Sequence, residues 1–115
     1  MVTIKPYLIE KAKSKSFFCV RLSASPEAVD EGADIVMIKP GITSLDIICM
    51  IKENFDFPIA VQNVSGEYAM IKAAAMQGWI GEEEWKVSSI ASIKRSGADM
   101  IVSYFSVDVA RYLED

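Results

Sequence analysis

The sequence contains no histidine and only two cysteines, Cys19 and Cys49, among its 115 residues. Zinc sites in proteins are built from sets of cysteine and histidine ligands, so this chain lacks the side chains for one and we predict no metal site within it. Two isolated cysteines are most simply reduced, and buried or half-buried. That state is consistent with a cytoplasmic protein.

Basic clusters and long apolar runs are also scarce. The chain has 12 lysines and arginines against 16 aspartates and glutamates, and its basic side chains cluster only at Lys11, Lys13 and Lys15. The resulting net charge of −4 argues against nucleic acid as a partner. The longest apolar runs fall far short of a bilayer span, and the N-terminal residues hold no continuous apolar stretch of the secretory type. We therefore expect neither a membrane segment nor a signal peptide.

The residues that are present favour a single folded α/β domain. With 51% hydrophobic and 24% charged residues, the composition is typical of a globular protein. Short apolar runs alternate with segments of helical periodicity, and this alternation predicts βα units and a parallel sheet. The predicted strands are 35–39, 59–64 and 100–104, and the predicted helices are 43–55, 67–77, 82–96 and 107–113.

The predicted sheet has open edges, because three strands are too few to close a barrel. Residues 1–22 are harder to interpret, although the apolar runs at 4–9 and 17–20 are candidate short strands that would cover one edge. Another chain, either a second copy in a homo-oligomer or a complementing partner, is the other means of covering an edge. Ser25 followed by Pro26 is typical of a helix start.

A Gly-Ala-Asp motif occurs twice, each time directly before a predicted strand. Lys39 lies seven residues after Gly32, and Tyr104 lies seven residues after Gly97. Because strand side chains alternate with a period of two, equal offsets in parallel strands place Lys39 and Tyr104 on the same side of the sheet. Both also lie at the carboxyl end of a strand, where parallel α/β proteins form their ligand sites.

Lys39, Ser65 and Tyr104 are the candidate site residues, since each lies at the carboxyl end of one of the three strands. A desolvated lysine amine at such a position is a nucleophile toward carbonyl groups. Simpler interpretations stay open for each residue. Lys39 can extend to water along an apolar stem, Ser65 can be a turn or N-cap residue, and Tyr104 can be an aromatic at the edge of the core. Met70 and Met76 are predicted to be core residues.

Two of these segments together form a specific pattern. They are Glu-Gly-Ala-Asp-Ile-Val-Met-Ile-Lys-Pro-Gly at 31–41 and Val-Ser-Gly-Glu-Tyr-Ala-Met at 64–70, followed by Lys-Arg-Ser-Gly-Ala-Asp at 94–99. With them, the sequence resembles the C-terminal part of porphobilinogen synthase, also called aminolaevulinate dehydratase. The resemblance divides the chain into an unmatched segment, 1–22, and a matched part, 23–115.

The resemblance implies a partial (β/α)₈ TIM barrel, comprising the last three or so βα units. It implies a lyase family that condenses two aminolaevulinate molecules into porphobilinogen in tetrapyrrole (haem) biosynthesis. The family's Schiff-base lysine matches Lys39, and the serine and tyrosine that bind the carboxylate of the same substrate match Ser65 and Tyr104. The zinc or magnesium of the complete enzyme, its second active-site lysine and its oligomerisation arm belong to segments that this chain does not match.

The chain departs from the family pattern at two pairs of positions. Thr43-Ser44 replaces the usual Pro-Tyr, and Gln62-Asn63 stands where the family commonly has an aromatic residue followed by glutamine or histidine. Only one of the two substrate positions is encoded here, so we expect this segment alone to be inactive. Two alternatives remain: the segment is one piece of a split barrel that needs a partner chain, or it is a non-catalytic remnant.

Overall fold

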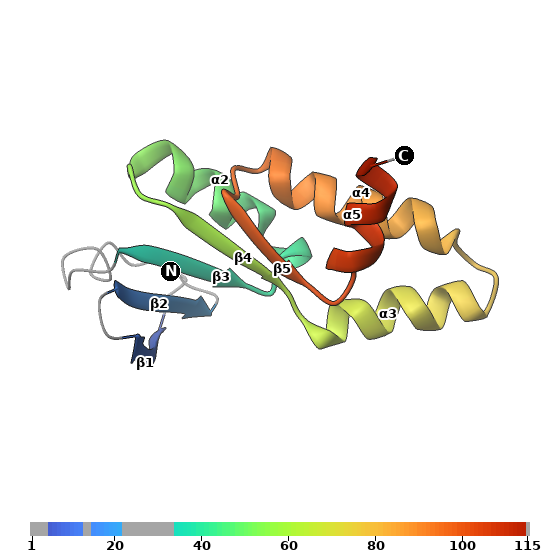
Figure 1. Ribbon diagram of the computed structural model, residues 1–115, viewed down its shortest axis with the longest axis horizontal. Coiled ribbons are helices and arrows are strands. Elements are labelled where there is room, and N and C mark those ends of the chain that lie inside the picture. Colours follow the sequence, from blue (N-terminus) through green and yellow to red (C-terminus); the bar gives the residue numbers. More distant parts are fainter. Residues whose placement is uncertain (1–4, 13–14, 22–33, 115) are drawn as a thin grey trace.

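The fold is built on a single five-stranded sheet, seen in a computed structural model that describes residues 5–12, 15–21 and 34–114 (Figure 1). The strand order follows the chain, β1-β2-β3-β4-β5. The first pair is antiparallel, and every other neighbouring pair is parallel. The strands are β1 Lys5–Ala12, β2 Lys15–Arg21, β3 Ile35–Lys39, β4 Ile59–Asn63 and β5 Met100–Ser103.

Helices connect the three C-terminal strands and follow the last one. A 3₁₀ turn and α2 join β3 to β4, two helices, α3 and α4, join β4 to β5, and α5 ends the described chain (Figure 1). Helical crossovers of this kind are what make parallel neighbours possible. The helices are η1 Ile42–Ser44, α2 Leu45–Asn54, α3 Ser65–Met76, α4 Glu82–Arg95 and α5 Ser106–Glu114.

The main core lies between one face of the sheet and the helices α2 and α4. Alternate residues of β3 and β4 face these helices, and they are almost fully buried, as the period of two in a strand requires. Their helical partners recur at three- and four-residue spacing within α2, which confirms the stripe predicted for that helix. The buried members are Val36, Ile38, Ile48, Ile51, Ile59, Val61, Ile93 and Ala98.

Glycines end two helices as the sequence predicts. Gly78 follows α3 with φ 72°, and Gly97 follows α4 with φ 122°, conformations that residues with a Cβ rarely adopt. The predicted start of α2 is wrong in one respect. The helix predicted from residue 43 begins at Leu45 with Ser44 as its N-cap residue, and the side chain of Ser44 makes no capping hydrogen bond. Its hydroxyl is fully buried and has no hydrogen-bond partner among the described residues.

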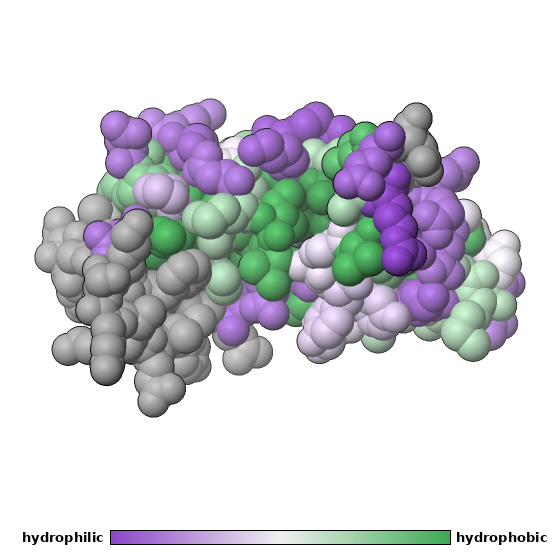
Figure 2. All heavy atoms as spheres, viewed as in Figure 1, coloured by the Kyte–Doolittle hydropathy of each residue, from purple (hydrophilic) through white to green (hydrophobic). Residues whose placement is uncertain are grey.

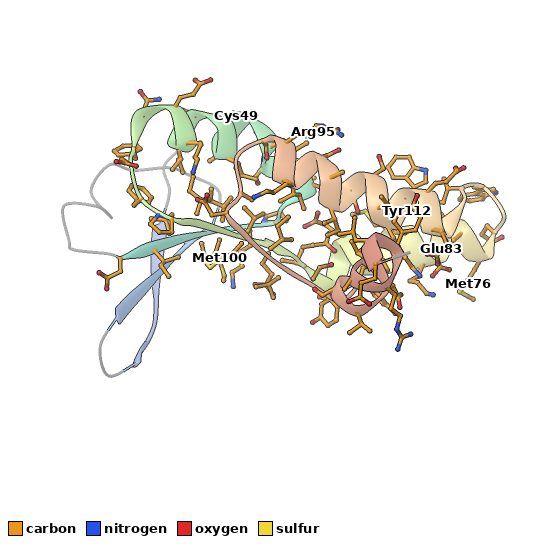
Figure 3. The ribbon with its side chains drawn as sticks, turned by 45° about the horizontal axis from the view of Figure 1, so that its top comes forward. Cys49, Met76, Glu83, Arg95, Met100 and Tyr112 are labelled. Atoms are coloured by element: carbon orange, nitrogen blue, oxygen red, sulfur yellow. The ribbon has the colours of Figure 1, made fainter. Side chains whose placement is uncertain are left out.

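The three predicted strands are confirmed to within one residue, and residues 5–9 and 17–20 of the two candidate runs also lie in strands. The helix start predicted at Ser25 lies outside the described residues. The predicted burial of Met70 and Met76 is wrong, because α3 buries Glu67 and Ile71 and turns both methionines outward, with 62% and 81% of their surface exposed. Cys49 is exposed on the outer side of α2, against the expectation of burial (Figure 3).

Asp99 of the second Gly-Ala-Asp motif links the amino-terminal ends of β4 and β5 by hydrogen bonds. The Asp99 carboxylate accepts hydrogen bonds from the Ile59 amide at 2.9 Å and from the Lys52 ammonium at 3.0 Å. The Asp99 amide in turn donates to the Ile59 carbonyl oxygen at 2.9 Å. The Ile59 amide, and then the Lys52 ammonium, hold the pKa of the Asp99 carboxyl below its usual range.

This lowered pKa predicts a specific loss of stability in acid. A carboxyl group whose pKa is lower in the folded state stabilises the fold above its unfolded pKa, about 3.9, and loses that contribution as the pH falls through the folded value. We expect Asp99→Asn to lower the free energy of unfolding at pH 7, and the difference from wild type to shrink below about pH 4. Denaturant unfolding at a series of pH values measures it, and a difference that does not change with pH would contradict the assignment.

Candidate active site at the carboxyl ends of the strands

Lys39 lies on the face of the sheet opposite α2 and α4, and Tyr104 lies in the turn that directly follows β5. Val36, Ile38 and Ile101 pack against the helices, so the alternating residues of the same strands, including Lys39, point the other way. The register pairs Ile38 with Val61 and Val61 with Ile101, which keeps the strands level. Figure 3 shows Met100, which starts this alternation in β5, on the side of the strand away from α2.

The three predicted site residues differ in their surroundings. Lys39 ends β3 and is half-buried, whereas Ser65 is exposed in the first turn of α3. Tyr104 directly follows β5, is 62% exposed, and its ring lies 5.4 Å from that of Tyr68. Tyr104 lines a shallow open hollow of about 230 Å³ with Gln62, Asn63, Val102 and Ser103. Lys39 and Ser65 share this edge of the sheet but are not among the residues that line the hollow.

A buried carboxylate joins the ends of β3 and β4. Glu67, in the first turn of α3, is only 2% exposed. One of its oxygens accepts the amide hydrogens of Gly41 at 2.8 Å and of Val64 at 3.2 Å. The other accepts the amide hydrogen of Ile42 at 2.7 Å. An ionised carboxylate only accepts hydrogen bonds, and backbone amides that follow strand ends provide donors that need partners.

The same network continues to the end of β5. Asn63 is fully buried and donates to the Glu67 carboxylate at 3.3 Å, while its side-chain oxygen accepts the Ser103 hydroxyl at 2.8 Å. The Ser103 oxygen accepts the Phe105 amide at 3.1 Å. The network therefore reaches the residues on both sides of Tyr104. It connects the three strand ends that carry the predicted site.

Glu67 and Asn63 were not predicted as site residues. A local signal for Glu67 exists, since an acid three residues after the N-cap position can accept the N-cap amide, as Glu67 does from Val64. Its bonds to Gly41 and Ile42 span 26 and 25 residues, and nothing in the local pattern indicates them. The buried side-chain amide of Asn63 lies between Glu67 and Ser103 and is hydrogen-bonded to both.

A buried lysine holds α5 against α4 beside the site. The Lys86 ammonium lies within 3.0 Å of carboxylate oxygens of Glu82, Glu83 and Asp108, and 5.6 Å from the centre of the Phe105 ring. The hydrogen bonds that Lys86 donates to the carboxylates of Glu83 and Glu82 raise the pKa of Lys86 above its usual value, so the group stays charged. Phe105 is fully buried next to Tyr68, which supports the turn that carries Tyr104.

The residues present do not fit a metal centre. The chain has no histidine, and within 34–114 no three cysteine, aspartate or glutamate side chains lie together in a way that would hold an ion. We therefore derive no step through a metal from these residues. In the same part of the chain, no helix is both long and apolar enough to cross a membrane.

Comparison with known proteins decides the family. A family model described as delta-aminolevulinic acid dehydratase matches residues 16–112. The chain belongs to this family. A dehydratase from Synechococcus elongatus is 56% identical over 85 residues, which cover 74% of this chain and 26% of the relative. A dehydratase from Halalkalibacterium halodurans is 49% identical over 98 residues, which cover 83% of this chain and 30% of the relative. The chain thus spans between a quarter and a third of the length of these two dehydratases.

A solved dehydratase structure agrees with the fold. The delta-aminolevulinic acid dehydratase (porphobilinogen synthase) of Toxoplasma gondii, crystallised with the reaction product porphobilinogen, has a TM-score of 0.71 and 41% identity. The match covers 75% of this chain and 25% of that one. The predicted fold class is confirmed, because the dehydratase fold is a TIM barrel and the parallel strands β3, β4 and β5 form an unclosed part of one. The division of the chain at residue 22 stays a prediction.

Proposed function

We propose that this chain supplies the Schiff-base-forming, C-terminal part of a porphobilinogen synthase of tetrapyrrole biosynthesis. In this proposal Lys39 forms an imine with the keto group of one aminolaevulinate molecule. Ser65 and Tyr104 bind the carboxylate of that molecule. The observation that carries the proposal is the hydrogen-bond network of Glu67, Asn63 and Ser103, which holds the ends of β3, β4 and β5 together in a dehydratase fold.

The proposed chemistry needs only groups that lie at this edge. The Lys39 amine attacks the keto carbon, and loss of one water from the resulting carbinolamine gives the imine. The half-buried position of Lys39 on a face with Met37 provides an apolar surface along its stem. The Ser65 and Tyr104 hydroxyls are hydrogen-bond donors for a carboxylate, and Ser65 begins α3, whose amino-terminal dipole favours negative charge.

The segment alone is expected to make no porphobilinogen from aminolaevulinate. Condensation requires two bound substrates, and the proposal assigns only one position to these residues. Supplying the remaining strands, as a dehydratase chain that lacks the part matched here, should produce porphobilinogen, measured by its colour with Ehrlich's reagent. The same mixture with Lys39→Arg is the control and should stay at background. Product formation by the purified segment alone would contradict this expectation.

An exposed sheet edge supports a complementing chain as the second candidate. Among the described strands β5 pairs only with β4, and Met100 and Val102 are 39% and 49% exposed. Figure 2 shows apolar residues gathered in the middle of the molecule, over β4 and β5. An open strand edge with exposed apolar side chains is a surface that proteins ordinarily cover. A partner supplying the rest of the barrel, or a second copy of the chain, would cover it.

The non-catalytic alternative makes a different prediction for the same site. A remnant without chemistry would bind or ignore aminolaevulinate equally well with and without Lys39, whereas the proposed enzyme segment needs Lys39 to form the imine.

The free, exposed Cys49 supports the proposed cytoplasmic location, since exposed thiols persist in reducing compartments.

A further inference from the structure

We propose that Glu67 is a positioning residue for Lys39, because its buried carboxylate sets the relative arrangement of the three strand ends at the site. The inference rests on the proposed role of Lys39. It adds a residue whose function is to control how that lysine reacts. The carboxylate acts through the backbone and contacts no substrate.

Both oxygens of the carboxylate are fully used by the protein. One accepts the amide hydrogens of Gly41 and Val64, and the other accepts the amide hydrogen of Ile42 and a side-chain hydrogen of Asn63. With 2% of its surface exposed, Glu67 cannot reach a ligand in the open hollow beside Tyr104. Four hydrogen bonds to one buried carboxylate hold the donor groups in a single arrangement around it.

The bonds fall where they control the direction of Lys39. Gly41 and Ile42 are two and three residues after Lys39. Pro40, which lies between Lys39 and Gly41, has a restricted φ and no amide hydrogen. The amides of Gly41 and Ile42 both donate to the Glu67 carboxylate, and these hydrogen bonds add to the packing of Gly41 against Ile93 and Val61 in holding the turn after β3. Loss of the carboxylate would free this turn to shift, and Lys39 with it.

The other two candidate residues depend on the same carboxylate. The Val64 amide, which Glu67 accepts, belongs to the residue before Ser65. The side-chain oxygen of Asn63 accepts the Ser103 hydroxyl, and the Ser103 oxygen accepts the Phe105 amide. Tyr104 therefore lies between two residues that this network holds in place. A single buried group thus connects the backbone next to Lys39, Ser65 and Tyr104.

The test compares Glu67→Gln with a matched change at the opposite end of the strands. Glutamine keeps the shape but brings an NH₂ group toward amide donors that need an acceptor. Asp99→Asn is the control, since Asp99 is also a carboxylate that accepts a strand amide, that of Ile59, but at the amino-terminal ends. Each variant is mixed with aminolaevulinate and borohydride under conditions of equal folded fraction, and adduct formation on Lys39 is followed by mass spectrometry.

We expect Glu67→Gln to slow trapping at Lys39 by about tenfold or more, and Asp99→Asn to change it by less than about twofold, because small misplacements of a reacting group have large rate effects. Amide hydrogen exchange at Gly41 and Ile42 should speed up in Glu67→Gln alone. Equal trapping rates in the two variants at equal folded fraction would overturn the proposal. If Glu67→Gln does not fold, Ser103→Ala, which breaks the link to Asn63, should give a smaller slowing of the same kind.

A separate reagent distinguishes this proposal from the proposed function. If the wild-type chain forms no adduct with aminolaevulinate, the role of Lys39 in the proposed function is contradicted. The effect of Glu67 on Lys39 is then read from reductive methylation with formaldehyde, which needs no binding site. The ratio of methylation at Lys39 to that at the exposed Lys94 should change in Glu67→Gln and not in Asp99→Asn. An unchanged ratio would overturn the positioning role.

Discussion

Replacing Lys39 by arginine is expected to abolish the adduct that borohydride traps between this chain and aminolaevulinate. Arginine keeps the positive charge and most of the stem, but its guanidinium does not form an imine with a ketone. Lys39 is half-buried at the end of a strand, so the substitution should leave the fold in place. The fold is checked by circular dichroism, and the adduct is measured by mass spectrometry.

Lys94→Arg is the matched control for this change. Lys94 is exposed near the end of α4 and donates to the Ala98 carbonyl oxygen, away from the carboxyl ends of the strands. The control should form the adduct at the wild-type rate. Equal labelling of Lys39→Arg and wild type would mean that other lysines react with the substrate, and it would remove the basis for assigning a Schiff-base role to Lys39.

Replacing Gly41 by alanine is expected to lower the free energy of unfolding by about 1–3 kcal/mol, the usual cost of overpacking a core. A Cβ at this position would lie 2.8 Å from Ile93 Cδ1, 3.0 Å from Val61 Cγ1 and 3.3 Å from the Gln62 carbonyl oxygen. Two of these neighbours are fully buried side chains and the third is backbone, so none has free space to move into. Glycine at the position after Pro40 therefore avoids close contacts with both β4 and α4.

Gly66→Ala is the control for Gly41→Ala. A Cβ at Gly66 meets nothing within 4 Å, and its φ is not in the left-handed region, so alanine there should leave stability nearly unchanged. Denaturant unfolding of the two variants measures the difference. We also expect Gly41→Ala to slow trapping at Lys39, since the Gly41 amide donates to Glu67. A similar stability for both variants would contradict the close packing described at Gly41.

Local patterns predicted the elements of this fold because each depends on nearby residues. The apolar run before Lys39, the glycines that follow α3 and α4, and the stripe along α2 all lie within a few residues of what they determine. The start of α2 is predicted at residue 43, but a 3₁₀ turn at 42–44 precedes the helix, so that α2 begins at Leu45. The exposure of Met70 and Met76 depends on which side of α3 the rest of the molecule covers, and composition does not contain that information.

The candidate site shows the same division between local and distant information. Equal offsets from two Gly-Ala-Asp motifs predict Lys39 and Tyr104 at the same edge of the sheet, and the structure has Lys39 at the end of β3 and Tyr104 directly after β5. The role of Glu67 depends on partners 25 and 26 residues away, across a crossover between strands, and only the packed fold brings them together. The half-burial of Lys39 and the wide exposure of Tyr104 likewise reflect a sheet that is open at β5.

The most direct test of the account is to locate the borohydride-trapped adduct on the wild-type chain. Trypsin does not cleave between Lys39 and Pro40, so digestion yields a peptide, 22–52, in which Lys39 is the only internal lysine. The account predicts that this peptide becomes heavier by one aminolaevulinate less one oxygen atom, the mass of a reduced imine. A folded chain in which this peptide stays unmodified, or in which the adduct lies on other lysines, would contradict it.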